Sequence, residues 1–144
     1  MALTGDYVNH SLKHVDRLAA FIGALPKPLF ATLGNHDSPN QRFYKQFNMD
    51  GRRYYSFSRG PVQFFVLDST YMAPAQLAWL KDVLPKSNAK WKIPYMHHPL
   101  YSSGKTHGSE VDLRTLIEPL FVSNGVDVVF AGHEHFYERL KPQQ

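Results

Sequence analysis

The sequence predicts an α/β fold, because short apolar strands alternate with amphipathic helices along most of the chain. Three apolar runs each lead directly into a group of histidine, amide or carboxylate side chains. Proline and glycine also punctuate the chain at short intervals, as is typical of a compact α/β domain. The predicted elements follow in the order helix, three strands, helix, strand, helix and strand.

Three segments have apolar residues three or four positions apart, which is the spacing of an amphipathic helix. Pro26 is expected to end the first of them. The third has the most regular spacing, and Asn124 and Gly125 are expected to terminate it. The expected helices are residues 11–25, 74–84 and 110–122.

Five apolar runs are expected to form strands. Two of them are rich in aromatic and β-branched residues and are separated by Arg59-Gly60-Pro61, which predicts a hairpin. The last run is rich in valine and ends at Gly132, which predicts a buried strand. The expected strands are residues 28–33, 54–58, 62–67, 91–96 and 126–131.

Composition excludes several classes of protein. The chain has no cysteine, which rules out disulfide scaffolds, cysteine zinc sites and thiol catalysis. Its net charge of +4 comes from scattered residues, so we expect no nucleic-acid partner. We also expect no membrane partner, because no apolar run approaches the roughly 18 residues of a span. The first ten residues lack the features of a secretory signal. The compartment stays open, because an exported protein can also lack cysteine.

Metal-binding side chains follow three of the predicted strands, and one more precedes the first helix. The ligand crevice of an open α/β sheet lies beyond the carboxyl ends of its strands, so these side chains are expected to meet there. Carboxylate, amide oxygen and imidazole together suit zinc, manganese or iron. The candidate metal ligands are Asp6, Asn35, His97, His133 and His135.

Four motifs in this order resemble those of the calcineurin-like metallophosphoesterases: Gly5-Asp6, Gly34-Asn35-His36-Asp37, His97-x-Pro99 and Gly132-His133-x-His135. The segments GPVQFFVLDST, QLAWLKDVL, MHHPLYSSG and GHEHFYERL are most similar to the purple acid phosphatase branch. The resemblance covers nearly the whole chain and implies a layered αββα sandwich. It also implies an acid-phosphatase-like phosphomonoesterase that cleaves a phosphate ester with a metal-bound hydroxide.

The same resemblance implies a role for each candidate ligand. Asp6 would bridge two metal ions, and His135 would bind the first of them. Asn35, His97 and His133 would complete the shell of the second. The implied cofactors are two divalent or trivalent ions of iron, zinc or manganese.

The resemblance further implies three catalytic residues. His36 would stabilise the phosphoryl transition state and protonate the leaving oxygen, and Asp37 would orient the His36 imidazole. His107 lies ten residues beyond His97 and would bind phosphate. His98 is interpreted as a residue outside the site, and Glu134 as a capping or solvated carboxylate.

The chain departs from the family pattern in two places. The first motif, Asp-x-(His/Gly/Thr), is absent, and the four residues before Gly5 are too few for an ordinary strand. Residues 1–144 are therefore expected to form a single partial catalytic domain that lacks its first strand and its C-terminal strands. The second departure is Asn9, which stands where the purple enzymes have tyrosine, so no iron–phenolate colour is expected.

Two alternatives to a phosphomonoesterase stay open. The first is a phosphodiesterase on the same scaffold, because the sequence does not reveal the substrate pocket. The second is an inactive remnant that binds only one metal, because the first metal would keep only Asp6 and His135.

Overall fold

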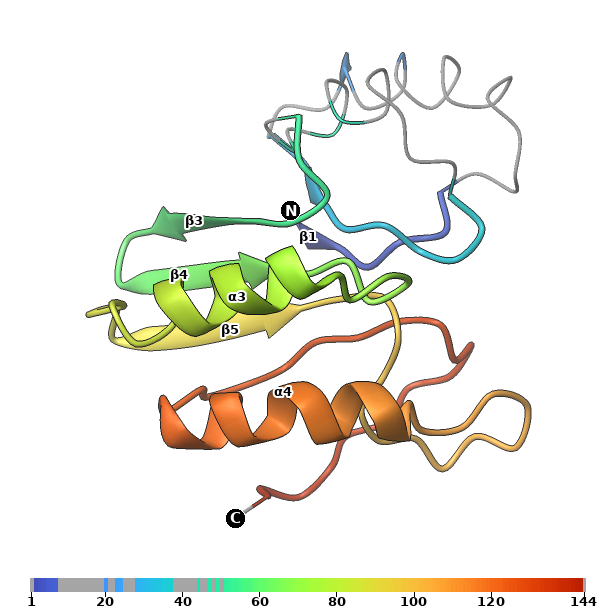
Figure 1. Ribbon diagram of the computed structural model, residues 1–144. Helices are drawn as coiled ribbons and strands as arrows, with labels where there is room; N and C mark the ends of the chain where they lie inside the picture. The colour runs from blue at the N-terminus through green and yellow to red at the C-terminus, as the bar shows by residue number, and fades with distance from the viewer. Residues whose placement is uncertain are drawn as a thin grey trace.

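The computed structural model in Figure 1 describes residues 2–7, 20, 23–24, 28–37, 44, 47, 49 and 51–143. Its strands form two sheets, of two and three strands. In the small sheet β1 (Ala2–Leu3) pairs in parallel with β2 (Phe30–Ala31). The larger sheet consists of β3 (Tyr55–Arg59), β4 (Val62–Val66) and β5 (Trp91–Tyr95).

The larger sheet confirms the predicted hairpin and the strand predicted after it. β3 and β4 pair antiparallel around a turn at Gly60, whose φ of +56° suits glycine. β4 then pairs in parallel with β5. A parallel pair needs a long crossover, and the chain makes it through helix α3 (Pro74–Val83).

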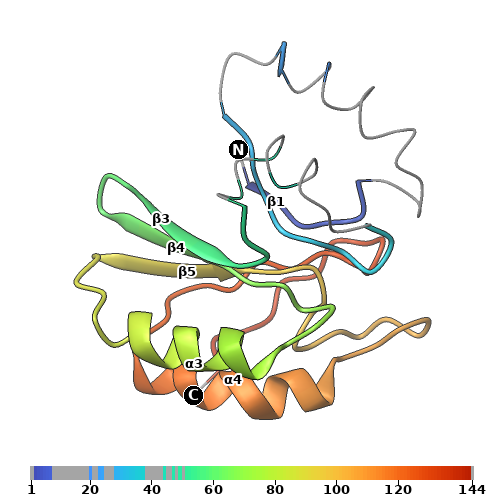
Figure 2. The ribbon, with the colours of Figure 1, turned by 45° about the horizontal axis from the view of Figure 1, so that its top comes forward.

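Both described helices lie on the same face of the larger sheet, as Figure 2 shows. Helix α3 begins at Pro74, where a missing N–H costs nothing. Helix α4 (Val111–Ser123) ends as predicted: the N–H of Asn124 bonds to Leu120 O, and Gly125 has a φ of +63°. The predicted α/β class is therefore confirmed.

The larger sheet has an apolar core on each face, because successive strand residues point to opposite sides. Phe65 and Val66 are neighbours on β4 and belong to different cores. The core on the helix side contains Phe65, Leu67, Leu80, Leu84, Met96, Leu100, Leu113, Ile117 and Phe121. The other contains Ala31, Leu33, Phe47, Met49, Tyr55, Val66 and Tyr95.

The prediction of a buried strand at 126–131 is wrong. This segment makes only an isolated bridge between Phe130 and Tyr95, and its Val128 and Phe130 side chains are 44% and 53% exposed. The N–H groups of Asp127 and Phe130 bond to Lys92 O and Pro94 O. The two donors are three positions apart in the sequence, whereas the two acceptors on β5 are two positions apart. The segment therefore has one extra residue relative to β5, as at a β-bulge.

The four residues before Gly5 include a strand shorter than the usual length of about 5–6 residues. Ala2 and Leu3 form β1, because β2 offers a parallel partner to a strand of only two residues. The predicted helix at 11–25 falls almost entirely outside the described residues. Across the part of the chain that is described, no helix has the length and apolar character needed to cross a membrane.

Candidate metal centre

His97 lies at the centre of the site, just beyond the carboxyl end of β5, and its side chain is buried. Its Nδ1 atom lies 2.7 Å from the carbonyl oxygen of Thr4. A carbonyl oxygen can only accept a hydrogen bond, so Nδ1 must carry the proton. In the neutral ring the other nitrogen, Nε2, is then left with a lone pair, which is the form that binds a metal.

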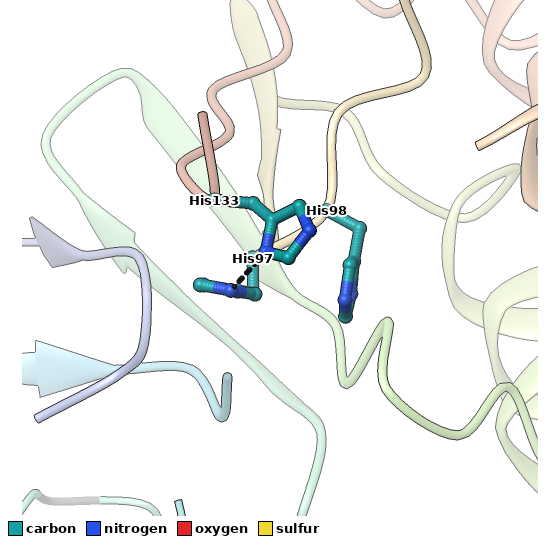
Figure 3. Close-up of side chains that lie close together, drawn as sticks. All are labelled: His97, His98 and His133. Atoms are coloured by element: carbon teal, nitrogen blue, oxygen red, sulfur yellow. Dashed lines mark hydrogen bonds between the residues drawn. The ribbon is translucent and has the colours of Figure 1, made fainter. Parts of the chain in front are cut away.

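Three other donor atoms converge on His97 Nε2. Asn35 Oδ1 lies 2.9 Å from it, His133 Nδ1 3.0 Å and Asp6 Oδ2 3.1 Å. Figure 3 shows the contact between the His97 and His133 rings. These atoms come from loops that follow β1, β2, β5 and the 126–131 segment, so distant parts of the sequence meet here.

The donor set fits a small cation. Four ligands at about 2.0–2.1 Å from a tetrahedral zinc ion lie about 3.3 Å from one another. The three separations from His97 Nε2, between 2.9 and 3.1 Å, are close to that value. With Nδ1 of His97 protonated, its Nε2 atom and the oxygens of Asn35 and Asp6 present lone pairs to a cation, and His133 Nδ1 does so in the tautomer protonated at Nε2.

Two of these candidate ligands have a strained backbone. Asp6 and His133 have φ angles of +59° and +68°, in the left-handed region that non-glycine residues rarely adopt. Such conformations cost on the order of 1–3 kcal/mol and cluster at functional sites. Gly5 permits the close approach of the loops, because a Cβ there would lie 2.6 Å from the nitrogen of Gly34.

Asp37 connects two of the loops that carry these ligands. Its buried carboxylate accepts hydrogen bonds from the main-chain N–H groups of Asp6, Tyr7 and Gly34, each at 2.8 Å. In return, Asp6 Oδ1 accepts the N–H of His36 at 2.9 Å. The described bonds of the Asp37 carboxylate therefore hold Asp6 and Asn35 in place.

His98 is a member of the cluster that the sequence interpretation left outside the site. One imidazole nitrogen from each of His97, His98 and His133 lies within 4.8 Å of the other two, and Figure 3 shows the three rings together. Ser69 Oγ lies 2.9 Å from His98 Nδ1 and also accepts the His98 N–H at 2.9 Å. Burial, followed by the nearby His97 and His133, lowers the pKa of His98 to about 4. In the sequence, only the position of His98 next to His97 indicated that His98 belongs to the cluster.

The remaining candidates lie around the rim. The ring of His107 lies 4.2 Å from that of His133, between centroids, although its side chain is exposed. His36 is exposed on the loop after β2. His135 is exposed as well, and among the described residues no contact joins it to the other candidate ligands.

Glu134 binds main-chain N–H groups at the rim. Its Oε1 atom accepts the N–H of Gly108 at 2.7 Å, and this bond is the largest reason why the pKa of Glu134 is lowered. The pKa of the neighbouring His133 is lowered as well, chiefly by burial and then by His97. Glu134 therefore caps main-chain donors, in agreement with its sequence interpretation.

The fold and the donor set together define an α/β protein with a metal-type site at the carboxyl ends of its strands. The sequence pattern of the calcineurin-like phosphoesterase family matches residues 1–137, so the chain belongs to this family. This membership confirms the resemblance seen in the four motifs. It also implies a dinuclear metal centre.

Relatives of this chain include purple acid phosphatases. It is 32% identical over 158 residues to purple acid phosphatase 18 of Arabidopsis thaliana, covering 94% of this chain and 36% of that protein. It is 41% identical over 104 residues to a purple acid phosphatase of Glycine max, covering 67% and 22%. The chain thus spans about a third or less of the length of these curated relatives.

A solved structure supports the fold. Purple acid phosphatase PPD1 from yellow lupin (Lupinus luteus) seeds superposes with a TM-score of 0.65 and is 21% identical. The alignment covers 93% of this chain and 30% of that one. The similarity extends over most of the chain and establishes the fold.

Proposed function

We propose that this chain is part of a metal-dependent phosphoester hydrolase, an acid-phosphatase-like enzyme acting on phosphate monoesters. Residues 1–144 would belong to a single catalytic domain. Family membership and the purple acid phosphatase relatives support this proposal. The observation that carries it is the convergence of Asp6, Asn35 and His133 on Nε2 of His97.

Asp6, Asn35, His97 and His133 would hold one metal ion, because their donor atoms already gather at one position. His135 would contribute to the other ion of the family's dinuclear centre. Zinc, manganese and iron all suit this donor set. Bound cations would activate a water molecule and screen the negative charge of the phosphate.

The chain's own residues would bind the substrate and move the proton. His36 is exposed beside the candidate ligands Asn35 and Asp6, so its imidazole can reach a phosphate ester and protonate the leaving oxygen. His107 lies against His133 and would bind a phosphate oxygen. Asp37 would keep the loops of Asp6 and His36 in register through its three main-chain bonds.

Nitrophenyl phosphate, assayed with added manganese, zinc or iron, tests this proposal. We expect metal-dependent turnover that falls about 100-fold or more in His36→Ala, the usual contribution of general acid catalysis. Metal content should stay the same in that variant. Absence of turnover by the metal-loaded protein, or full turnover by His36→Ala, would contradict the proposal. A nitrophenyl diester is assayed in parallel. Faster cleavage of the diester than of the monoester would identify a phosphodiesterase.

A second candidate is a module that binds a single metal ion without catalysis. The observation favouring it is the placement of the ligands: four donors gather at one position, while His135 is exposed and apart from them. Elemental analysis of the metal-loaded chain separates the two candidates. Two ions per chain support the hydrolase, and one ion without turnover supports the module.

A further inference from the structure

We propose that Glu134 is a positioning residue: its carboxylate holds the loop 102–108 and thereby fixes the place of His107 beside the metal site. The hydrogen bonds and packing of the loop carry this inference. Only the expected effect on phosphate rests on the proposed function.

The main chain directs the Glu134 carboxylate into the loop. Glu134 follows His133, whose φ of +68° turns the chain sharply. The N–H of Glu134 then bonds to Gly132 O at 2.8 Å, which closes a tight turn. From this turn, Glu134 Oε1 accepts the N–H of Gly108 at 2.7 Å. A hydrogen bond to an ionised carboxylate is about twice as strong as one between neutral groups.

The loop is built closely around this carboxylate. A Cβ on Gly104 would lie 2.5 Å from Cδ and Oε1 of Glu134 and 2.6 Å from Oε2. Real Cβ atoms do not approach so near, so any side chain at position 104 must displace Glu134. Gly108, the donor, has a φ of +79°, which suits glycine at the other end of the loop. The carboxylate therefore lies between two glycines.

Other bonds hold the first residues of the loop, whereas Glu134 holds its last residue, Gly108. Ser109 Oγ accepts the N–H of Ser102 at 2.8 Å, and Ser102 Oγ accepts the N–H of Gly104 at 2.9 Å. Glu138 accepts the N–H of Ser103 at 3.0 Å. The bond from Gly108 to Glu134 is the one made next to His107.

Fixing the loop also fixes His107. Its ring centroid lies 4.2 Å from that of His133, and His133 Nδ1 lies 3.0 Å from His97 Nε2. Because Glu134 directly follows His133, one short segment supplies a candidate metal ligand and holds the neighbouring loop. Releasing the carboxylate should move His107 away while the donor cluster around His97 stays in place.

The experiment compares Glu134→Ala, Glu134→Gln, Gly104→Ala and the double variant Glu134→Ala/Gly104→Ala in the full chain. The control is Asp127→Asn, because that exposed carboxylate also accepts a main-chain N–H, that of Lys92 at the start of β5, and has no bond to the loop. Hydrogen–deuterium exchange over residues 102–108 reports on the loop without any metal or substrate. The affinity for inorganic phosphate, the KM for nitrophenyl phosphate and the metal content are then measured on the manganese-loaded proteins.

We expect Glu134→Ala and Gly104→Ala each to speed amide exchange in the loop and to weaken phosphate binding about tenfold, as for one lost charge-assisted bond. KM should rise by a similar factor while metal content is unchanged. Glu134→Gln should restore part of the effect, because its amide oxygen can still accept from Gly108. The double variant should resemble Glu134→Ala alone, because the clash at Gly104 disappears with the carboxylate.

Unchanged exchange in Glu134→Ala would overturn the inference, and so would a looser loop with unchanged phosphate affinity and KM. Fully additive effects in the double variant would also overturn it. If the unmodified chain bound no phosphate, the proposed function would fail, while the exchange data would still decide whether Glu134 holds the loop.

Discussion

The main-chain N–H of Asp6 donates to Oδ2 of Asp37 at 2.8 Å, across 31 positions of sequence. The same Oδ2 atom accepts the N–H of Gly34, and Oδ1 accepts that of Tyr7. One buried carboxylate thus joins the loop after β1 to the loop after β2, which together carry Asp6 and Asn35.

Asp37→Asn should therefore weaken both the fold and the metal site. The new amide has only one acceptor oxygen, and its NH2 group would face a main-chain N–H. We expect a loss of about 1–3 kcal/mol in the free energy of unfolding, the cost of an unsatisfied buried group. Metal affinity should fall about 10- to 100-fold, as for other residues that orient ligands. Urea unfolding and calorimetric titration with zinc measure the two effects.

Asp127→Asn is the matched control for this substitution. Asp127 also accepts a main-chain N–H, that of Lys92 at 2.8 Å, but it is exposed. Its replacement should change the free energy of unfolding by no more than about 0.5 kcal/mol and leave zinc binding intact. Equal effects of the two substitutions would show that burial and loop bridging are not what matters at Asp37.

Substitution of His97 should separate the metal positions. His97→Ala removes the nitrogen on which the other donors converge, so zinc affinity should fall by more than about 100-fold, beyond the effect of outer residues. His135→Ala should leave one ion bound, because His135 lies apart from that cluster. Elemental analysis and titration with zinc check both outcomes. Retention of tight zinc binding by His97→Ala would contradict this assignment.

The metal-free chain should lose stability as the pH falls from about 6.5 to about 4. Burial and the neighbouring His97 lower the pKa of His98 from 6.5 to about 4 in the folded chain. In this window the unfolded chain binds a proton at His98 that the folded chain does not, so stability rises with pH. The lowered pKa of His133 acts in the same direction.

Urea unfolding in the presence of a chelator, from pH 4 to pH 8, measures this dependence. His98→Asn should flatten the slope below pH 6.5, because it removes an imidazole whose pKa is lowered to about 4 in the folded chain. A slope in His98→Asn equal to that of the unmodified chain would assign the pH dependence to other groups.

Phe65 and Phe130 provide a matched pair for testing the correction at residues 126–131. Phe65 is fully buried between the sheet and the helices, whereas Phe130 is 53% exposed. Phe65→Ala should cost about 3–5 kcal/mol of unfolding free energy, as is usual for a core phenylalanine. Phe130→Ala should cost less than about 1 kcal/mol. Chemical denaturation measures both, and similar costs would show that Phe130 is buried in solution.

Local patterns predicted the elements whose partners lie nearby in the sequence. The hairpin of β3 and β4 depends on its turn at Gly60, and the end of α4 on Asn124 and Gly125. Residues 126–131 differ from the predicted buried strand, because an apolar pattern shows that burial is favourable but does not supply the neighbouring strand that would provide it. In the described part of the chain only β5 pairs with this segment, and it does so out of register.

The sequence by itself determined the α/β class, the phosphoesterase family and the residues whose chemistry suits a metal, because periodicity and motif spacing are local properties. Only the tertiary structure decided which of those residues meet. It brought Asp6, Asn35 and His133 to Nε2 of His97. It also placed His98, whose ring contacts Ser69, beside this cluster and left His135 exposed. Contacts between residues far apart in the sequence, such as that of His97 with Thr4 across 93 positions, depend on how the strands pair and how the loops pack.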